Sequence, residues 1–200
     1  MKNAAVVALL LVSVLASNGT HNMRNPDLTP EWGPLYWFFD RGLEPLEVWA
    51  AGAIAQIQGR DPQAARALKA LEIAEERIAE IEVLAVANKS DHIEELSRNY
   101  EFWINDVQAI ASAIADQTMR LGVQERIALA TGIHRVVLEA ISTKVPEQSK
   151  QWIQQAITKS ENGQQKAIEN LERELGAGFD AEYYRQYLNQ TISEWQTRRR

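Results

Sequence analysis

A long stripe of mostly apolar residues runs through the middle of the chain and constrains its fold more than any other feature. Its members recur at steps of three and four, the spacing of one face of an α-helix: Ile93, Leu96, Tyr100, Trp103, Val107, Ile110, Ile114, Gln117 and Leu121. Asp91 and Glu94 match a capping box, and Gly122 suits the position after a helix. We therefore expect one central helix from Asp91 to Gly122, about 45 Å long.

The flanking segments supply helices that can pack along this central one. The predicted set is a first helix from Pro34 that Gly42 and Pro45 interrupt or kink, a helix from Asp61, one from Gly122 to about Lys144, one from Pro146 to Gly176, and a last one from Asp180. Short connections favour antiparallel neighbours. The predicted fold class is all-α, a bundle of long antiparallel helices over residues 34–176. A kinked, aromatic-rich helix opens it, and an added C-terminal helix covers residues 177–200.

The first residues have the pattern of an export signal. Lys2 precedes an apolar run from Ala4 to Ala16 that is too short to span a bilayer, and Val14 and Ala16 occupy the small-residue positions of a cleavage site. We expect a signal peptide over residues 1–16, an extended lead-in over 17–33, and no transmembrane span after cleavage. The alternatives are a retained membrane anchor or a buried helix. The expected location is extracytoplasmic, secreted or attached to the cell surface.

If the chain is exported, its three glycosylation sequons can be modified, and the absence of cysteine rules out the disulfides that exported proteins often contain. Asn18, Asn88 and Asn189 each begin an Asn-x-Ser/Thr triplet and are candidate glycosylation sites. The chain has no cysteine, so disulfides and thiolate metal sites are excluded. Its formal net charge of -6 argues against a nucleic-acid partner.

No catalytic signature is found, and no cofactor is expected. The sequence lacks a phosphate loop, a nucleophile elbow and a His-Glu-x-x-His helix. The Glu-x-x-His pairs of di-metal bundles are also missing, because Lys89 precedes His92 and Thr131 precedes His134. His134 lies on the apolar side of its helix, where it is either a buried, hydrogen-bonded side chain or a ligand or proton-handling group. The acidic residues of 72–82, with Arg77 among them, indicate a solvated helix face.

Several motifs resemble the domain-of-unknown-function family 5667, whose members are exported helical proteins of archaea and bacteria. The likeness lies in Gly33 to Phe38, in Ala74 to Glu80, and above all in Lys144-Val145-Pro146-Glu147-Gln148. It covers roughly Pro34 to Glu172. It implies export and long helices but no known activity. The family pattern has a histidine matching His134 and others where this chain has Gln155 and Gln164, which are poor transition-metal ligands.

The sequence favours a non-enzymatic protein that works through surface contacts, as an envelope or assembly subunit, with a protein partner or a second copy. The alternative is a ligand- or metal-binding bundle that uses His134 and nearby polar residues. The candidate interface is the C-terminal helix, where tyrosine, tryptophan and arginine widen the apolar side: Tyr183, Tyr184, Arg185, Tyr187 and Trp195. The alternative there is that one side of this helix packs on the bundle. Asn189 is expected on the opposite side, away from contact.

Overall fold

The computed structural model describes residues 42–90 and 92–199. The predicted signal peptide, the lead-in, Asn18 and the aromatic run before residue 42 lie outside these ranges. The described helices are α3 (Glu44–Ile57), α4 (Pro62–Val86), α5 (Ile93–Ser112), α6 (Gln117–Ser142), α7 (Glu147–Leu175) and α8 (Ala181–Arg199), with a 3-10 turn at Gly176–Gly178. The all-α fold class is confirmed. Within the described ranges, no helix has the length and apolar character needed to cross a membrane.

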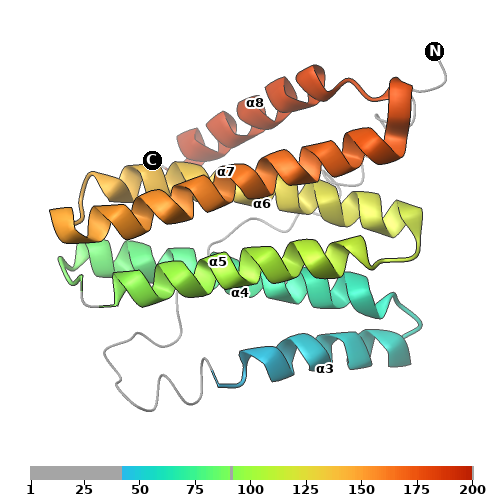
Figure 1. Ribbon diagram of the computed structural model, residues 1–200, viewed down its shortest axis with the longest axis horizontal. Coiled ribbons are helices and arrows are strands. Elements are labelled where there is room, and N and C mark those ends of the chain that lie inside the picture. Colours follow the sequence, from blue (N-terminus) through green and yellow to red (C-terminus); the bar gives the residue numbers. More distant parts are fainter. Residues whose placement is uncertain (1–41, 91, 200) are drawn as a thin grey trace.

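The four long helices form two packed pairs, α4 with α5 and α6 with α7, and α4 faces α6 while α5 faces α7. Figure 1 shows α3 at one edge, α8 at the opposite edge, and the four long helices between them. The closest packing is between α6 and α7 and between α4 and α5, while α5 also packs on α7 and α3 packs on α4. The core therefore lies among α4, α5, α6 and α7, and the outer helices each cover one side of it.

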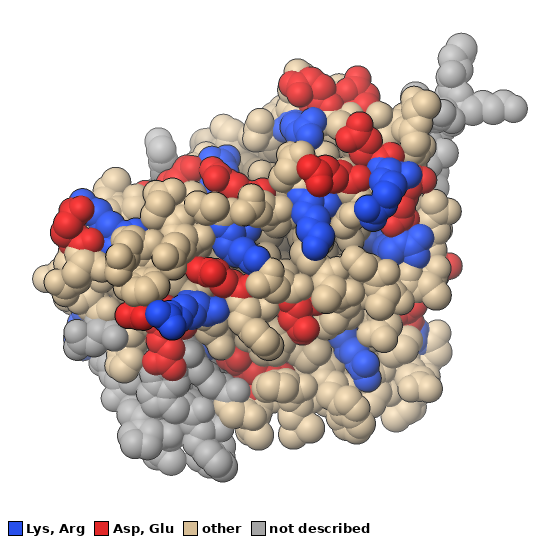
Figure 2. All heavy atoms as spheres, viewed as in Figure 1, with Lys and Arg blue, Asp and Glu red and all other residues tan. Residues whose placement is uncertain are grey.

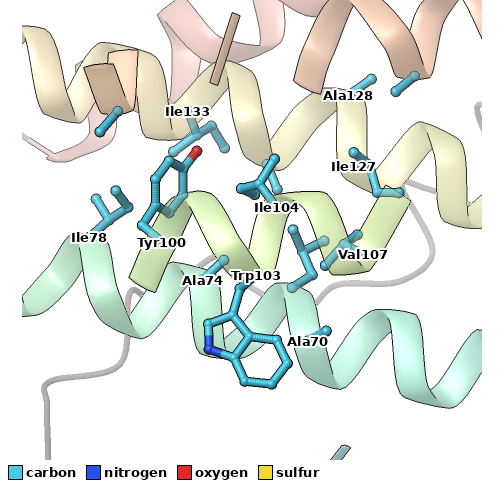
Figure 3. Close-up of a cluster of buried hydrophobic side chains, with 14 of the residues drawn as sticks. Ala70, Ala74, Ile78, Tyr100, Trp103, Ile104, Val107, Ile127, Ala128 and Ile133 are labelled. Atoms are coloured by element: carbon cyan, nitrogen blue, oxygen red, sulfur yellow. The ribbon is translucent and has the colours of Figure 1, made fainter. Parts of the chain in front are cut away.

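The N-terminal half of the central stripe is the middle of this core. Ile93, Leu96, Tyr100, Trp103 and Val107 on α5 are all buried. Figure 3 shows Tyr100 pointing toward α6 and Trp103 pointing the other way, toward α4. The three-and-four spacing thus placed the buried face of α5 correctly.

The prediction of one continuous helix from Asp91 to Gly122 is wrong. Helix α5 ends at Ser112, and α6 begins at Gln117. Asp116 caps the new helix, because its Oδ1 accepts a hydrogen bond from the Met119 backbone N–H at 2.8 Å. Gly122 lies inside α6 and ends no helix. Ile114 and Leu121 are buried nonetheless, so the stripe continues across a turn between two helices.

Other predicted helix ends are confirmed. Asp61 caps α4 by accepting from the Gln63 and Ala64 backbone N–H groups, each at 2.8 Å. Asp180 caps α8 by accepting from the Tyr183 N–H at 2.9 Å. Gly176 ends α7 with a φ of 64°, a value that favours glycine. These helix ends depend on the residue itself and its near neighbours in the chain, so they could be predicted from the sequence.

An interruption or a kink was expected at Gly42 and Pro45, and the described part of the chain has a turn at residues 42–43, after which α3 begins at Glu44. Pro45 lies in the first turn of α3, where its missing N–H breaks no helical bond. The proline therefore begins a helix, and the predicted segment before residue 42 lies outside the described range.

Candidate functional site

Helix α3 presents four large apolar residues to solvent, while Gly52 and Ala55 face the bundle. The buried side consists of Glu44, Val48, Gly52 and Ala55. The outward side carries Leu46, 57 % exposed, Trp49, 59 %, Ile54, 52 %, and Ile57, 87 %. With Ala50 and Ala53 they occupy an arc of about 140° at 100° per residue. We call these six residues the outer face of α3.

The outer face of α3 is also free of charge. Figure 2 shows mixed acidic and basic residues over most of the visible surface, whereas the edge formed by α3 is almost entirely uncharged. Glu47, beside the face, pairs with Lys69 on α4 at 3.1 Å. This face was not singled out from the sequence. The alternation of small and large residues around the helix was the available signal.

A buried ionic cluster fixes α3 to the bundle. The Arg77 guanidinium on α4 lies 3.2 Å from the Glu44 carboxylate of α3 and 3.0 Å from Glu80. Trp103 on α5 donates its Nε1–H to Glu44 at 2.8 Å. All four side chains are buried. The prediction of a solvated face for Arg77 and Glu80 is therefore wrong, because Glu44, from a helix distant in sequence, meets them there.

This cluster positions the outer face. Breaking a buried ion pair leaves an uncompensated charge and costs about 3–5 kcal/mol, so rotation of α3 about its axis is opposed strongly. Gly52 adds a close contact, because a Cβ there would lie 2.4 Å from Nε of Arg66. Helix α3 is held in an orientation that presents Leu46, Trp49 and Ile57 to solvent.

His134 is buried, as one of the two sequence-based alternatives expected. Its Nδ1 lies 3.3 Å from the Tyr100 hydroxyl oxygen, which in turn lies 2.6 Å from Ser160 Oγ. Ser160 donates to the Ala156 carbonyl at 3.0 Å. Since each hydroxyl has one hydrogen, Tyr100 donates to Ser160 and accepts from Nδ1–H of His134. Burial raises the pKa of Tyr100 far above its usual range.

Gln155 and Gln164 do not form a shared site with His134. Gln155 is exposed, whereas the Gln164 side chain is half-buried and donates to the Ala128 carbonyl at 3.2 Å. They are nine residues apart and so lie on opposite sides of α7. Within residues 42–90 and 92–199, no three His, Asp or Glu side chains are grouped to hold a metal ion.

The candidate interface on α8 is mostly used for packing. Tyr184, Leu188 and Ile192 are buried, and Tyr187 and Trp195 pack partly against the core. Tyr183, at the start of the helix, remains exposed. The alternative, in which one side of α8 packs on the bundle, describes this helix. Arg185 makes a weak 3.4 Å hydrogen bond to Gln165 of α7.

A polar hollow separates α8 from α7. It has a volume of about 340 Å³, and Arg135, Gln164, Arg185, Leu188 and Asn189 are among the residues that line it. Asn189 is exposed and contributes to the lining of this hollow. Asn88 lies in the exposed turn after α4, with a φ of 55°.

Comparison with known proteins identifies one segment of the chain. Residues 55–148, just under half of its length, match the model of a domain of unknown function (DUF5667). This segment covers α4, α5 and α6 and ends at the Val-Pro-Glu-Gln junction that carried the resemblance in the sequence. Most of α3, nearly all of α7, and α8 lie outside it. No curated protein and no solved structure matches the chain significantly.

Proposed function

We propose that this chain, with its segment of the DUF5667 family, is a non-enzymatic exported protein that binds another protein through the outer face of α3. One observation carries the proposal: Leu46, Trp49, Ile54 and Ile57 face solvent while Gly52 and Ala55 of the same helix face the core. A helix that served only to cover the bundle would have the reverse arrangement, because burying large apolar side chains stabilises most.

The free energy available at this face is sufficient for specific binding. Covering one large apolar side chain contributes about 1.5–3 kcal/mol, and the face holds four such residues at partial exposure. The rigid attachment of α3 through Arg77 and Glu44 lowers the entropy that binding must overcome. Trp49 supplies the residue type most enriched at binding hot spots.

A non-enzymatic role is supported by the position of the polar groups. Tyr100, His134 and Ser160 form a hydrogen-bonded group that could transfer protons, and all three are at most 1 % exposed. A substrate would need to open the bundle to reach them. Export is supported by Lys2 and the apolar run to Ala16, and N-terminal sequencing of native protein should begin at or near Ser17.

Site-specific photo-crosslinking in the native cells tests the contact surface. A photoreactive amino acid at Ile57, the last residue of α3, should give crosslinks to protein. The matched control is Val86, the last residue of α4 and 70 % exposed, which should give few. Equal yields at both positions, or crosslinks only to lipid at Ile57, would refute the proposed function.

A further inference from the structure

We infer that the outer face of α3 binds the same face of a second copy of the chain, with the two α3 helices antiparallel. The inference rests on the proposed function and names the partner. It starts from the order of large and small residues along the face, which is Leu46, Trp49, Ala50, Ala53, Ile54 and Ile57. This order reads the same, in size classes, from either end.

An interface between identical faces requires that residue i of one copy meet residue j of the other, and that j meet i. In an antiparallel pair centred between Ala51 and Gly52, Ala50 lies level with Ala53 of the second copy. Leu46 lies level with Ile57 of the second copy. Trp49 lies level with Ile54 of the second copy, but the two side chains are on opposite flanks of the contact. Small residues thus meet at the centre, where two helix axes can approach to about 8 Å, and large ones close both ends.

Charge favours the same arrangement. The molecule carries a formal net charge of -6, so two copies repel each other except where a face lacks charge. The outer face has none, and Glu47 beside it is already paired with Lys69. In an antiparallel pair, the positive N-terminal end of each helix dipole lies beside the negative C-terminal end of the other. A parallel pair would place like dipole ends together.

The expected assembly is a weak dimer. One pair of helices of this length covers less than the roughly 800 Å² per partner of a standard interface, so dissociation in the micromolar range is expected. Sedimentation of the full mature chain over a wide concentration range should show a monomer–dimer equilibrium. Ile57→Glu should weaken it at least about tenfold, whereas Val86→Glu, which also places a carboxylate at an exposed helix end, should leave it unchanged.

Engineered cysteines test the register, since the natural chain has none. A disulfide needs Cα atoms within about 7 Å. Leu46→Cys and Ile57→Cys should each stay uncrosslinked alone and form a disulfide dimer when mixed. Crosslinking of either variant with itself would overturn the antiparallel pairing.

Two further outcomes separate this inference from the proposed function. A chain that stays monomeric at every concentration, yet crosslinks from Ile57 to a different protein in its cells, overturns self-association and leaves the proposed function standing. A monomer with no protein crosslink at Ile57 overturns both.

Discussion

The Tyr100 hydroxyl is the middle member of a hydrogen-bonded series that joins three helices. It connects His134 of α6 to Ser160 of α7 from its place on α5. In Tyr100→Phe both neighbours lose a buried partner, and the expected loss is about 1–3 kcal/mol of unfolding free energy. Urea denaturation measures it. Tyr183→Phe, on an exposed side chain, is the control and should change little. Equal effects of the two substitutions would show that the series does not stabilise the bundle.

Glu125 makes the stability of the protein depend on pH. Burial raises the pKa of its carboxyl from 4.5 to about 7, so between these values the folded chain holds a proton that the unfolded chain has lost. The contribution of Glu125 to the unfolding free energy is therefore largest below about pH 4.5. It falls by roughly 3 kcal/mol as the pH rises to about 7. The nearby Tyr184 hydroxyl stays neutral throughout, because burial and the Glu125 carboxylate raise its pKa.

Glu125→Gln should remove most of this dependence. The neutral amide keeps nearly the same shape, so the variant is expected to be more stable than the natural protein at pH 8 and similar to it at pH 4.5. Urea denaturation at both pH values measures the difference. Glu172→Gln, on the exposed side of α7, should shift neither curve. The prediction would be contradicted if the unfolding free energy of the natural protein, relative to that of Glu125→Gln, rose between pH 4.5 and pH 8.

At the scale of the helix, the turn between α5 and α6 was beyond sequence reasoning. Residues 113–116 contain no glycine or proline, and Ala113 and Ala115 are strong helix formers. The apolar spacing continues through the turn because Ile114 and Leu121 both reach the core. Periodicity reports burial, so it located the buried face correctly but could not show that the chain reverses there.

Asp116→Ala distinguishes the two arrangements by the sign of its effect. In the structure the substitution removes the hydrogen bond to the Met119 N–H and should destabilise the protein by about 1 kcal/mol. In one continuous helix it would stabilise, because alanine is the better helix former. Thr118→Ala, an exposed change in the first turn of α6, serves as the control for propensity alone. Chemical denaturation of the three proteins gives the comparison.

The ionic cluster shows why the candidate site was harder to predict than the fold. Arg77 and Glu80 have the spacing of an ordinary exposed ion pair on one helix, and nothing near them in sequence indicates burial. Their burial depends on Glu44 and Trp103, which come from α3 and α5. The caps at Asp61 and Asp180 needed only local information, whereas this cluster and the outward orientation of α3 are properties of three helices together.

At the scale of the molecule, the first and the last of the described helices differ in how they pack. Figure 1 places α3 and α8 at opposite edges. Helix α8 buries Tyr184, Leu188 and Ile192 against the bundle, and a Cβ at Gly132 of α6 would lie 2.5 Å from Ile192 Cδ1. That fit between α6 and α8 is typical of a structural cover. Helix α3 instead combines a polar attachment with an open apolar face.

Deleting residues 179–200 tests this division of roles. Loss of the three buried side chains should remove several kcal/mol of burial, and about 1 kcal/mol corresponds to roughly 2–4 °C for a chain of this size. The melting temperature should therefore fall by more than about 5 °C, while self-association through α3, measured by sedimentation below the lower melting point, stays as in the full chain. An unchanged melting temperature would show that α8 is not part of the fold. A folded monomer would place the contact surface on α8, the helix that the sequence favoured, and remove it from α3.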